Sequence, residues 1–171
     1  MTRAIRSRHT RRSFGAASFL SRRDGRSSVA VQLRSMVRLH RMDAAGRDSL
    51  IRELASHLER EELVSYAYLH GSFLDQPAFH DVDIGVQVLQ DDVATPVALE
   101  LTARLSTVVG VPIDVRPLNG APLPFRFHAL RGRLLMCRDD AQLAEAIEDT
   151  TRRYLDLAPI LRIAAREAFA P

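Results

Sequence analysis

Residues 71–86 read GSFLDQPAFHDVDIGV, and they are the most informative stretch of this chain. A strand-like run leads into Gly71 and Ser72, and after an eight-residue spacer a second apolar run carries Asp81 and Asp83. Side chains two positions apart in a β-strand point to the same face of the sheet, so the two carboxylates can converge on one point. Carboxylates arranged in this way bind divalent cations, and divalent cations bind nucleotide phosphates.

The Gly71-Ser72 pair suits a phosphate contact. Glycine lets the backbone turn tightly against a ligand. Ser72 can cap a short helix or turn, and the N–H groups and dipole at a helix start favour an anion. A Gly-Ser pair alone is a common turn, so its meaning here depends on the Asp-x-Asp motif that follows.

A third carboxylate, Asp114, lies in a strand of similar character, thirty-one residues after Asp83. It stands between Ile113 and Val115, and a charge inside an apolar strand is costly unless it is paired or bound to a metal. If the strands are neighbours, the three carboxylates can hold two divalent cations about 4 Å apart, the arrangement used for in-line nucleotidyl transfer. Arg116 has two open interpretations: it contacts a triphosphate, or it pairs with a carboxylate of the site.

The bulk composition, with 171 residues of which 46% are hydrophobic, is that of one globular domain. No apolar run approaches the ~20 residues that a membrane-spanning helix requires. A single cysteine, Cys137, excludes an internal disulfide and fits a reducing compartment. The sequence therefore predicts a cytoplasmic protein without a membrane partner.

Positive charge is concentrated in the first 41 residues. They contain eleven Arg and one acidic residue, Asp24, whereas residues 42–171 contain thirteen Arg and twenty acidic residues, so the two segments carry +10 and −7. This arm has three interpretations: a nucleic-acid-binding arm, an organellar transit peptide, or a disordered extension upstream of a start at Met36 or Met42. We assign residues 1–42 to a disordered extension and expect no direct nucleic-acid binding by the domain that follows.

The periodicity of residues 43–171 predicts an α/β (α+β) domain in which helices flank a small mixed β-sheet. Ser49 is the predicted N-cap of the first helix. Gly110 is predicted to end the second helix, and Pro159 is a point at which the last helix can be interrupted. The predicted strands cover 63–70, 82–89, 111–118 and 133–137. The predicted helices cover 49–62, 93–109 and 139–168, and residues 123–130 form a short helix or a loop.

The order Gly-Ser, Asp-Val-Asp and a later Asp resembles the DNA polymerase β-type nucleotidyltransferase superfamily in its minimal, single-domain form. Residues 113–161 read IDVRPLNGAPLPFRFHALRGRLLMCRDDAQLAEAIEDTTRRYLDLAPIL. This second half is similar to the MntA-type antitoxins of HEPN/MNT toxin–antitoxin systems, with a carboxylate strand, Leu-Asn, a Pro-containing turn and a terminal helix carrying Tyr-Leu-Asp. In many relatives basic or glycine residues follow Gly-Ser, whereas this chain has Asp75, Gln76 and Pro77 in its spacer.

The resemblance implies a role for each residue of the motif. Gly71 and Ser72 would hold the β and γ phosphates of ATP. Asp81 and Asp83 would bind two Mg²⁺ ions, and Asp114 would be the third metal ligand and the activator of the acceptor.

The resemblance also implies a partner. In such antitoxins the acceptor is a tyrosine hydroxyl of a HEPN ribonuclease toxin, and adenylylation silences the toxin. The expected function is therefore Mg²⁺-dependent transfer of AMP from ATP to that ribonuclease. Two alternatives stay open: an antitoxin that binds the toxin without catalysis, and a nucleotidyltransferase acting on a small molecule or an RNA end.

Overall fold

The computed structural model describes residues 38–168. The predicted basic extension falls largely on residues 1–37, which lie outside the described residues. The described elements, in chain order, are β1 (His40–Arg41), α2 (Ala44–Leu58), β2 (Val64–His70), α3 (Ser72–Asp75), β3 (Ala78–Phe79), β4 (Val82–Val88), the 3-10 turn η1 (Asp91–Val93), α4 (Ala94–Val109), β5 (Ile113–Pro117), α5 (Leu123–Leu130), β6 (Arg133–Cys137) and α6 (Asp140–Ala168).

The main sheet has four strands in the order β5-β4-β2-β6. Strand β2 runs antiparallel to both β4 and β6, whereas β4 and β5 run parallel because α4 carries the chain back to the same end of the sheet. This is the mixed sheet that the sequence predicts. Strands β1 and β3 form a separate two-stranded antiparallel pair, which periodicity did not predict.

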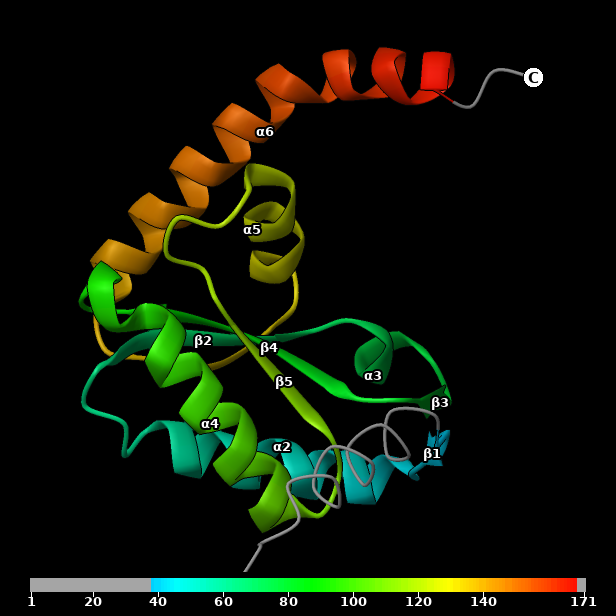
Figure 1. Cartoon of the computed structure of the whole chain (residues 1–171), viewed down its shortest axis with the longest axis vertical. Helices are drawn as coiled ribbons and strands as arrows, with labels where there is room; N and C mark the ends of the chain where they lie inside the picture. The colour runs from blue at the N-terminus through cyan, green and yellow to red at the C-terminus, as the bar shows by residue number, and fades with distance from the viewer. Residues whose placement is uncertain (1–37, 169–171) are drawn as a thin grey trace, which may run out of the picture.

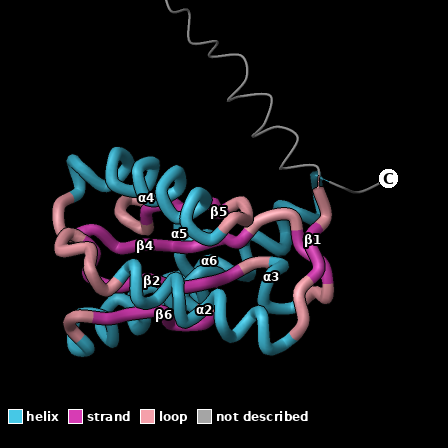
Figure 2. The backbone as a smooth tube through the Cα atoms, turned by 90° about the horizontal axis from the view of Figure 1, so that it is seen from below, coloured by secondary structure: helices cyan, strands magenta, loops and turns pink. Residues whose placement is uncertain are grey.

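Helices cover both faces of the main sheet. Helices α2 and α4 lie on one face, and α5 and α6 lie on the other (Figure 1). Figure 2 shows the four strands side by side, with α4 across β4 and β5 and α2 across β2 and β6. The predicted architecture, a small mixed sheet flanked by helices, is confirmed.

Successive side chains along each strand point to opposite faces of the sheet, so the protein has one hydrophobic core on each face. On β4, Val82, Ile84 and Val86 are fully buried in the larger core, which lies against α2 and α4. The residues between them face α5, as Gly85 shows: a Cβ there would lie 3.3 Å from Cβ of Ala129. The smaller core, on the α5 and α6 side, consists of Tyr66, Tyr68, Leu118, Ala129 and Leu143.

The first helix begins earlier than predicted. Asp43, not Ser49, is the N-cap of α2, and its Oδ1 accepts a hydrogen bond from the Gly46 amide at 2.8 Å. The helix also ends earlier, at Leu58. Residues 59–63 form the turn between α2 and β2. The guanidinium of Arg138 holds this turn by donating to the carbonyls of Glu59, Glu61 and Val64.

The last helix, α6, begins after Asp139, whose Oδ1 accepts hydrogen bonds from the amides of Ala141 and Gln142. It continues through Pro159 instead of being interrupted. Proline lacks the N–H that would bond to the preceding turn, and helices bend where this bond is lost. Figure 1 shows the orange-to-red part of α6 bending and projecting away from the sheet.

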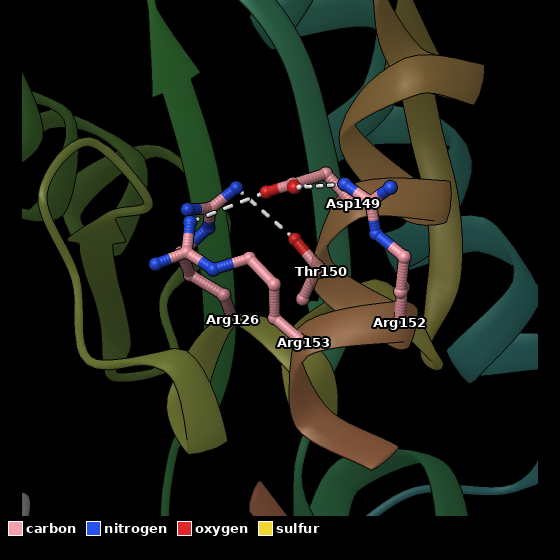
Figure 3. Close-up of polar contacts among 5 residues, drawn as sticks. All are labelled: Arg126, Asp149, Thr150, Arg152 and Arg153. Atoms are coloured by element: carbon pink, nitrogen blue, oxygen red, sulfur yellow. Dashed lines mark hydrogen bonds and ion pairs between the residues drawn. The ribbon is translucent and has the colours of Figure 1, made fainter. Parts of the chain in front are cut away.

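Polar and aromatic contacts join α5 to the first half of α6. Arg126 on α5 donates to the hydroxyl of Thr150, a buried residue of α6, at 3.0 Å (Figure 3). Beside it, Asp149 pairs with Arg152 and Arg153 of the same helix at 3.1 and 3.3 Å (Figure 3). One helical turn later, the ring of Tyr154 stacks on Phe127, with centroids 3.8 Å apart and planes 7° from parallel.

Candidate functional site

The sheet register brings two of the three predicted carboxylates together. Asp83 on β4 is the direct partner of Asp114 on β5 in the parallel pair. Asp81 lies two residues before Asp83, immediately ahead of β4. All three side chains are half-buried at the end of the sheet where the two parallel strands begin. The predicted neighbourhood of Asp83 and Asp114 therefore follows directly from the strand pairing.

Electrostatics link the three carboxylates. The pKa of Asp83 is raised from 3.8 to about 6, mainly by burial and then by the charges of Asp81 and Asp114, while Arg116 acts in the opposite direction. A buried carboxylate surrounded by like charges is stabilised when a cation or a proton arrives. The site therefore has a strong preference for positive charge beside Asp83.

Arg116 pairs with Asp114. Its Nε donates to Oδ2 of Asp114 at 2.8 Å, and the bond raises the pKa of the guanidinium. The pair is partly open to solvent, with 61% of the Arg116 side chain and 34% of the Asp114 side chain exposed. The guanidinium carbon also lies 5.9 Å from the centre of the Phe125 ring. Of the two interpretations of Arg116, the ion pair is confirmed and the triphosphate contact stays a prediction.

Gly71 lies directly against Asp83. Its φ of +80° is in the region that L side chains rarely adopt. A Cβ built at this position would stand 2.1 Å from Oδ2 of Asp83, which is far inside van der Waals contact. Only glycine therefore lets the turn after β2 pass beside the carboxylate. Gly71 is also the N-cap of α3, and Ser72 is the first residue of that helix. The prediction that Ser72 caps the helix is therefore wrong.

His70 forms the edge of the site on β2. It is the antiparallel partner of Asp83, and its ring meets Phe125 edge-on at 5.5 Å. Its buried Nε2 has no hydrogen-bond partner among the described residues. Burial and the charge of Arg116 lower its pKa, while Asp114 opposes the shift. A neutral imidazole with an unused nitrogen therefore stands next to the carboxylates.

The donor set fits magnesium. Within residues 38–168, no group of three or more His, Cys, Asp or Glu side chains is gathered closely enough to hold a metal ion as the side chains stand. Asp114, for example, directs one oxygen to Arg116. The backbone nevertheless places three hard oxygen donors on neighbouring strand positions, and Mg²⁺ prefers such ligands. The close approach of the Gly71 backbone to Asp83 and the raised pKa of Asp83 agree with a cation beside that carboxylate.

Comparison with known proteins identifies the fold and the family. The family model described as "Polymerase beta, Nucleotidyltransferase" matches residues 52–141, which is just over half of the chain and includes all three carboxylates. This chain belongs to the polymerase beta nucleotidyltransferase family. No curated protein has a sequence that matches this one.

Several solved structures to which this chain is similar in fold are toxin–antitoxin complexes. One is an MntA–HepT complex with two aspartates changed to glutamate; it has 16% identity and a TM-score of 0.58, and the match covers 72% of this chain and 98% of that one. A toxin–antitoxin complex with AMP-PNP has 19% identity and a TM-score of 0.55, with 71% and 98% covered. A third contains the tri-AMPylated HEPN toxin of Shewanella oneidensis with its MNT antitoxin, at 14% identity and a TM-score of 0.52, with 70% and 98% covered.

Two features of the nucleotidyltransferase site were not predicted. The sequence indicates only a short helix or loop around Phe125, yet its ring contacts both His70 and Arg116. The sequence marks His70 only as the end of a strand, and the strand register is what shows that it lies opposite Asp83. Among the described residues, no helix is long and apolar enough to cross a membrane.

Proposed function

We propose that this nucleotidyltransferase is a Mg²⁺-dependent antitoxin that transfers AMP from ATP to a tyrosine of a partner HEPN ribonuclease in the cytoplasm. The observation that carries the proposal is the pairing of Asp83 with Asp114, with Asp81 close enough for its charge to raise the pKa of Asp83. Three coupled carboxylates at the edge of a sheet support two-metal nucleotidyl transfer, because each alone would be an unfavourable buried charge.

Each residue of the site has a role in this proposal. Asp81 and Asp83 would hold both ions, and Asp114 would ligate the ion on the acceptor side. Bound Mg²⁺ would neutralise the triphosphate and stabilise the charge that develops on the α-phosphoryl group. Gly71 and Ser72 would hold the β and γ phosphates, and Arg116 would add a positive charge beside them.

Asp114 would also manage the proton of the acceptor. The tyrosine oxygen forms a bond to the α-phosphorus of ATP, the bond from that phosphorus to pyrophosphate breaks, and the tyrosine proton passes to Asp114. Arg116 would orient the Asp114 carboxylate through its existing bond to Oδ2. The products are AMP-tyrosine and pyrophosphate, so atoms and charge balance without a further reactant.

The solved relatives support the choice of acceptor. One contains a toxin carrying three AMP groups, and another contains an ATP analogue. In the MntA–HepT complex with two aspartates changed to glutamate, these two positions are two residues apart, which is also the spacing of Asp81 and Asp83. The matches cover nearly the full length of those chains, which supports the proposal that residues 43–171 form a minimal domain of that kind.

The test is transfer of label from α-labelled ATP to a HEPN ribonuclease, sought first in the gene next to this one, with and without Mg²⁺. We expect label on the ribonuclease, and loss of both label and protection in the double variant Asp81→Asn and Asp83→Asn. The control is the double variant Asp92→Asn and Glu100→Gln, which removes the same charge from exposed positions outside the site. Neutralisation of the toxin without label would instead establish binding without catalysis.

A further inference from the structure

Arg47 on α2 reaches across to the spacer that separates the two halves of the site. Its Nη1 donates to the carbonyl of Phe73, and its Nη2 donates to the carbonyl of Gln76 at 2.7 Å. Its Nε donates to the carbonyl of Met42 at 3.2 Å. One guanidinium therefore fixes two carbonyls of the spacer and one at the start of the domain.

The same guanidinium lies against two buried aromatic rings of the spacer. Its central carbon is 4.9 Å from the centre of the Phe73 ring and 5.4 Å from that of Phe79. The two rings meet edge-to-face at 4.8 Å, and each residue is only 1% exposed. On β1, His40 stacks on Phe79 at 5.7 Å. Cation–π contacts of a partly buried arginine add to its hydrogen bonds.

Phe73 and Phe79 anchor the two ends of the spacer in the core, and β3 pairs with β1, but the turn between them depends on Arg47. Helix α3 is a single turn whose start has no side-chain cap, and residues 75–77 are exposed. Gly71 and Ser72 precede the segment and Asp81 follows it, so a shift of the spacer moves the phosphate motif relative to the carboxylates. Misplacement of reacting groups by about 1 Å can cost about a hundredfold in rate.

We propose that Arg47 is a positioning residue that sets the distance between the phosphate-binding turn and the metal-binding carboxylates. This inference rests on the proposed function, because it assigns the spacer to a nucleotide site. The guanidinium of Arg47 is directed to backbone carbonyls of Met42, Phe73 and Gln76, so its role is to position the spacer from another helix.

The chain supplies a matched control for a purely structural role. Arg138 also donates to three backbone carbonyls, those of Val64, Glu59 and Glu61, at 2.9, 2.7 and 3.1 Å. It fixes the turn before β2, whereas Arg47 fixes the turn after β2. Loss of either arginine removes three charged hydrogen bonds to backbone, but only Arg47 lies beside the site.

The experiment measures the affinity for AMP-PNP with Mg²⁺ by calorimetry, and the unfolding temperature, in the full chain and in Arg47→Met, Arg47→Lys and Arg138→Met. We expect Arg47→Met to weaken AMP-PNP binding by about tenfold or more. We expect Arg47→Met and Arg138→Met to lower the unfolding temperature by similar amounts. Arg138→Met should change the affinity for AMP-PNP by less than about threefold. Arg47→Lys keeps the charge without the fork of donors and should lie between Arg47→Met and the unchanged chain.

The outcomes separate this inference from the proposed function. If the unchanged chain does not bind AMP-PNP with Mg²⁺, the proposed function fails and the inference fails with it. If the unchanged chain binds and Arg47→Met weakens binding no more than Arg138→Met does, the proposed function stands and Arg47 has only a structural role. Hydrogen exchange at the amides of residues 72–79 provides a second readout: it should accelerate in both Arg47 variants and not in Arg138→Met, and equal protection in all variants would overturn the proposal.

Discussion

Removal of the Asp83 carboxylate should make the metal-free protein more stable while abolishing nucleotidyl transfer. Asp83 is held between Asp81, Asp114 and the turn at Gly71, and its pKa is raised from 3.8 to about 6. The folded protein therefore binds this proton more tightly than the unfolded chain does. Folding stability must then fall as pH rises through the interval between the two values, and the loss is complete above about pH 7.

The size of this effect follows from the shift. About two pKa units at 1.36 kcal/mol each set an upper limit of about 3 kcal/mol. Asp83 is only half-buried, so solvent screening reduces the value to about 1–2 kcal/mol. For a domain of this size, such a gain corresponds to an unfolding temperature about 2–8 °C higher in Asp83→Asn at pH 7.5. At pH 4.5 the difference should shrink to about one third, because Asp83 is protonated there in the folded protein.

The assay is thermal unfolding of the unchanged chain and of Asp83→Asn in EDTA at pH 7.5 and 4.5, followed by titration with Mg²⁺ at pH 7.5. Added Mg²⁺ should raise the unfolding temperature of the unchanged chain and not that of the variant. Asp92→Asn, an exposed carboxylate outside the site, serves as control and should show no gain. Equal stability of the two proteins at pH 7.5, or a gain that is undiminished at pH 4.5, would refute the electrostatic account of Asp83.

Two further substitutions test packing around the site and between the helices. Gly71→Ala should destabilise the fold by about 1–3 kcal/mol more than Gly110→Ala in urea unfolding, because Gly71, with φ +80° and ψ −166°, has a backbone that side chains avoid and its Cβ would meet Asp83, whereas Gly110 is in the left-handed helical region with open space around it; equal losses would show that both the backbone strain and the clash are relieved. Tyr154→Ala should cost about 1–2 kcal/mol in the same assay, because it removes the ring that stacks on Phe127; an unchanged midpoint would show that the stack does not stabilise the α5–α6 contact.

The central strands and the carboxylate pair could be predicted from the sequence because their signals are local. Apolar alternation marks β4 and β5, and a charge inside such a strand needs a partner. The α4 crossover between them makes parallel neighbours the natural arrangement, which is how Asp83 and Asp114 come to face each other. The end of β2 near His70, and a short helix or turn after it, could also be predicted, because Gly71 separates them.

The parts that could not be predicted depend on contacts between distant segments. The pairing of β1 with β3 involves two residues on each strand, too few for any periodic pattern. Arg47 has no motif around it, and only the packing of α2 against the spacer gives its guanidinium three carbonyls to bind. The N-cap was misplaced at Ser49 because the first apolar residues follow it, whereas the helix starts with Ala44 under the cap of Asp43.

The contact between Gly71 and Asp83 also has a consequence for how members of this family diverge. A side chain at position 71 is disfavoured twice, by a backbone with φ +80° and ψ −166° and by one carboxylate oxygen of Asp83. A lineage that abandons nucleotide transfer and loses the aspartate removes only the second obstacle, so the glycine should outlast the aspartate. Glycine at position 71 without an acidic residue at position 83 would therefore mark descendants that keep the fold after catalysis has gone, and glycine beside an intact aspartate would mark those under selection for the reaction.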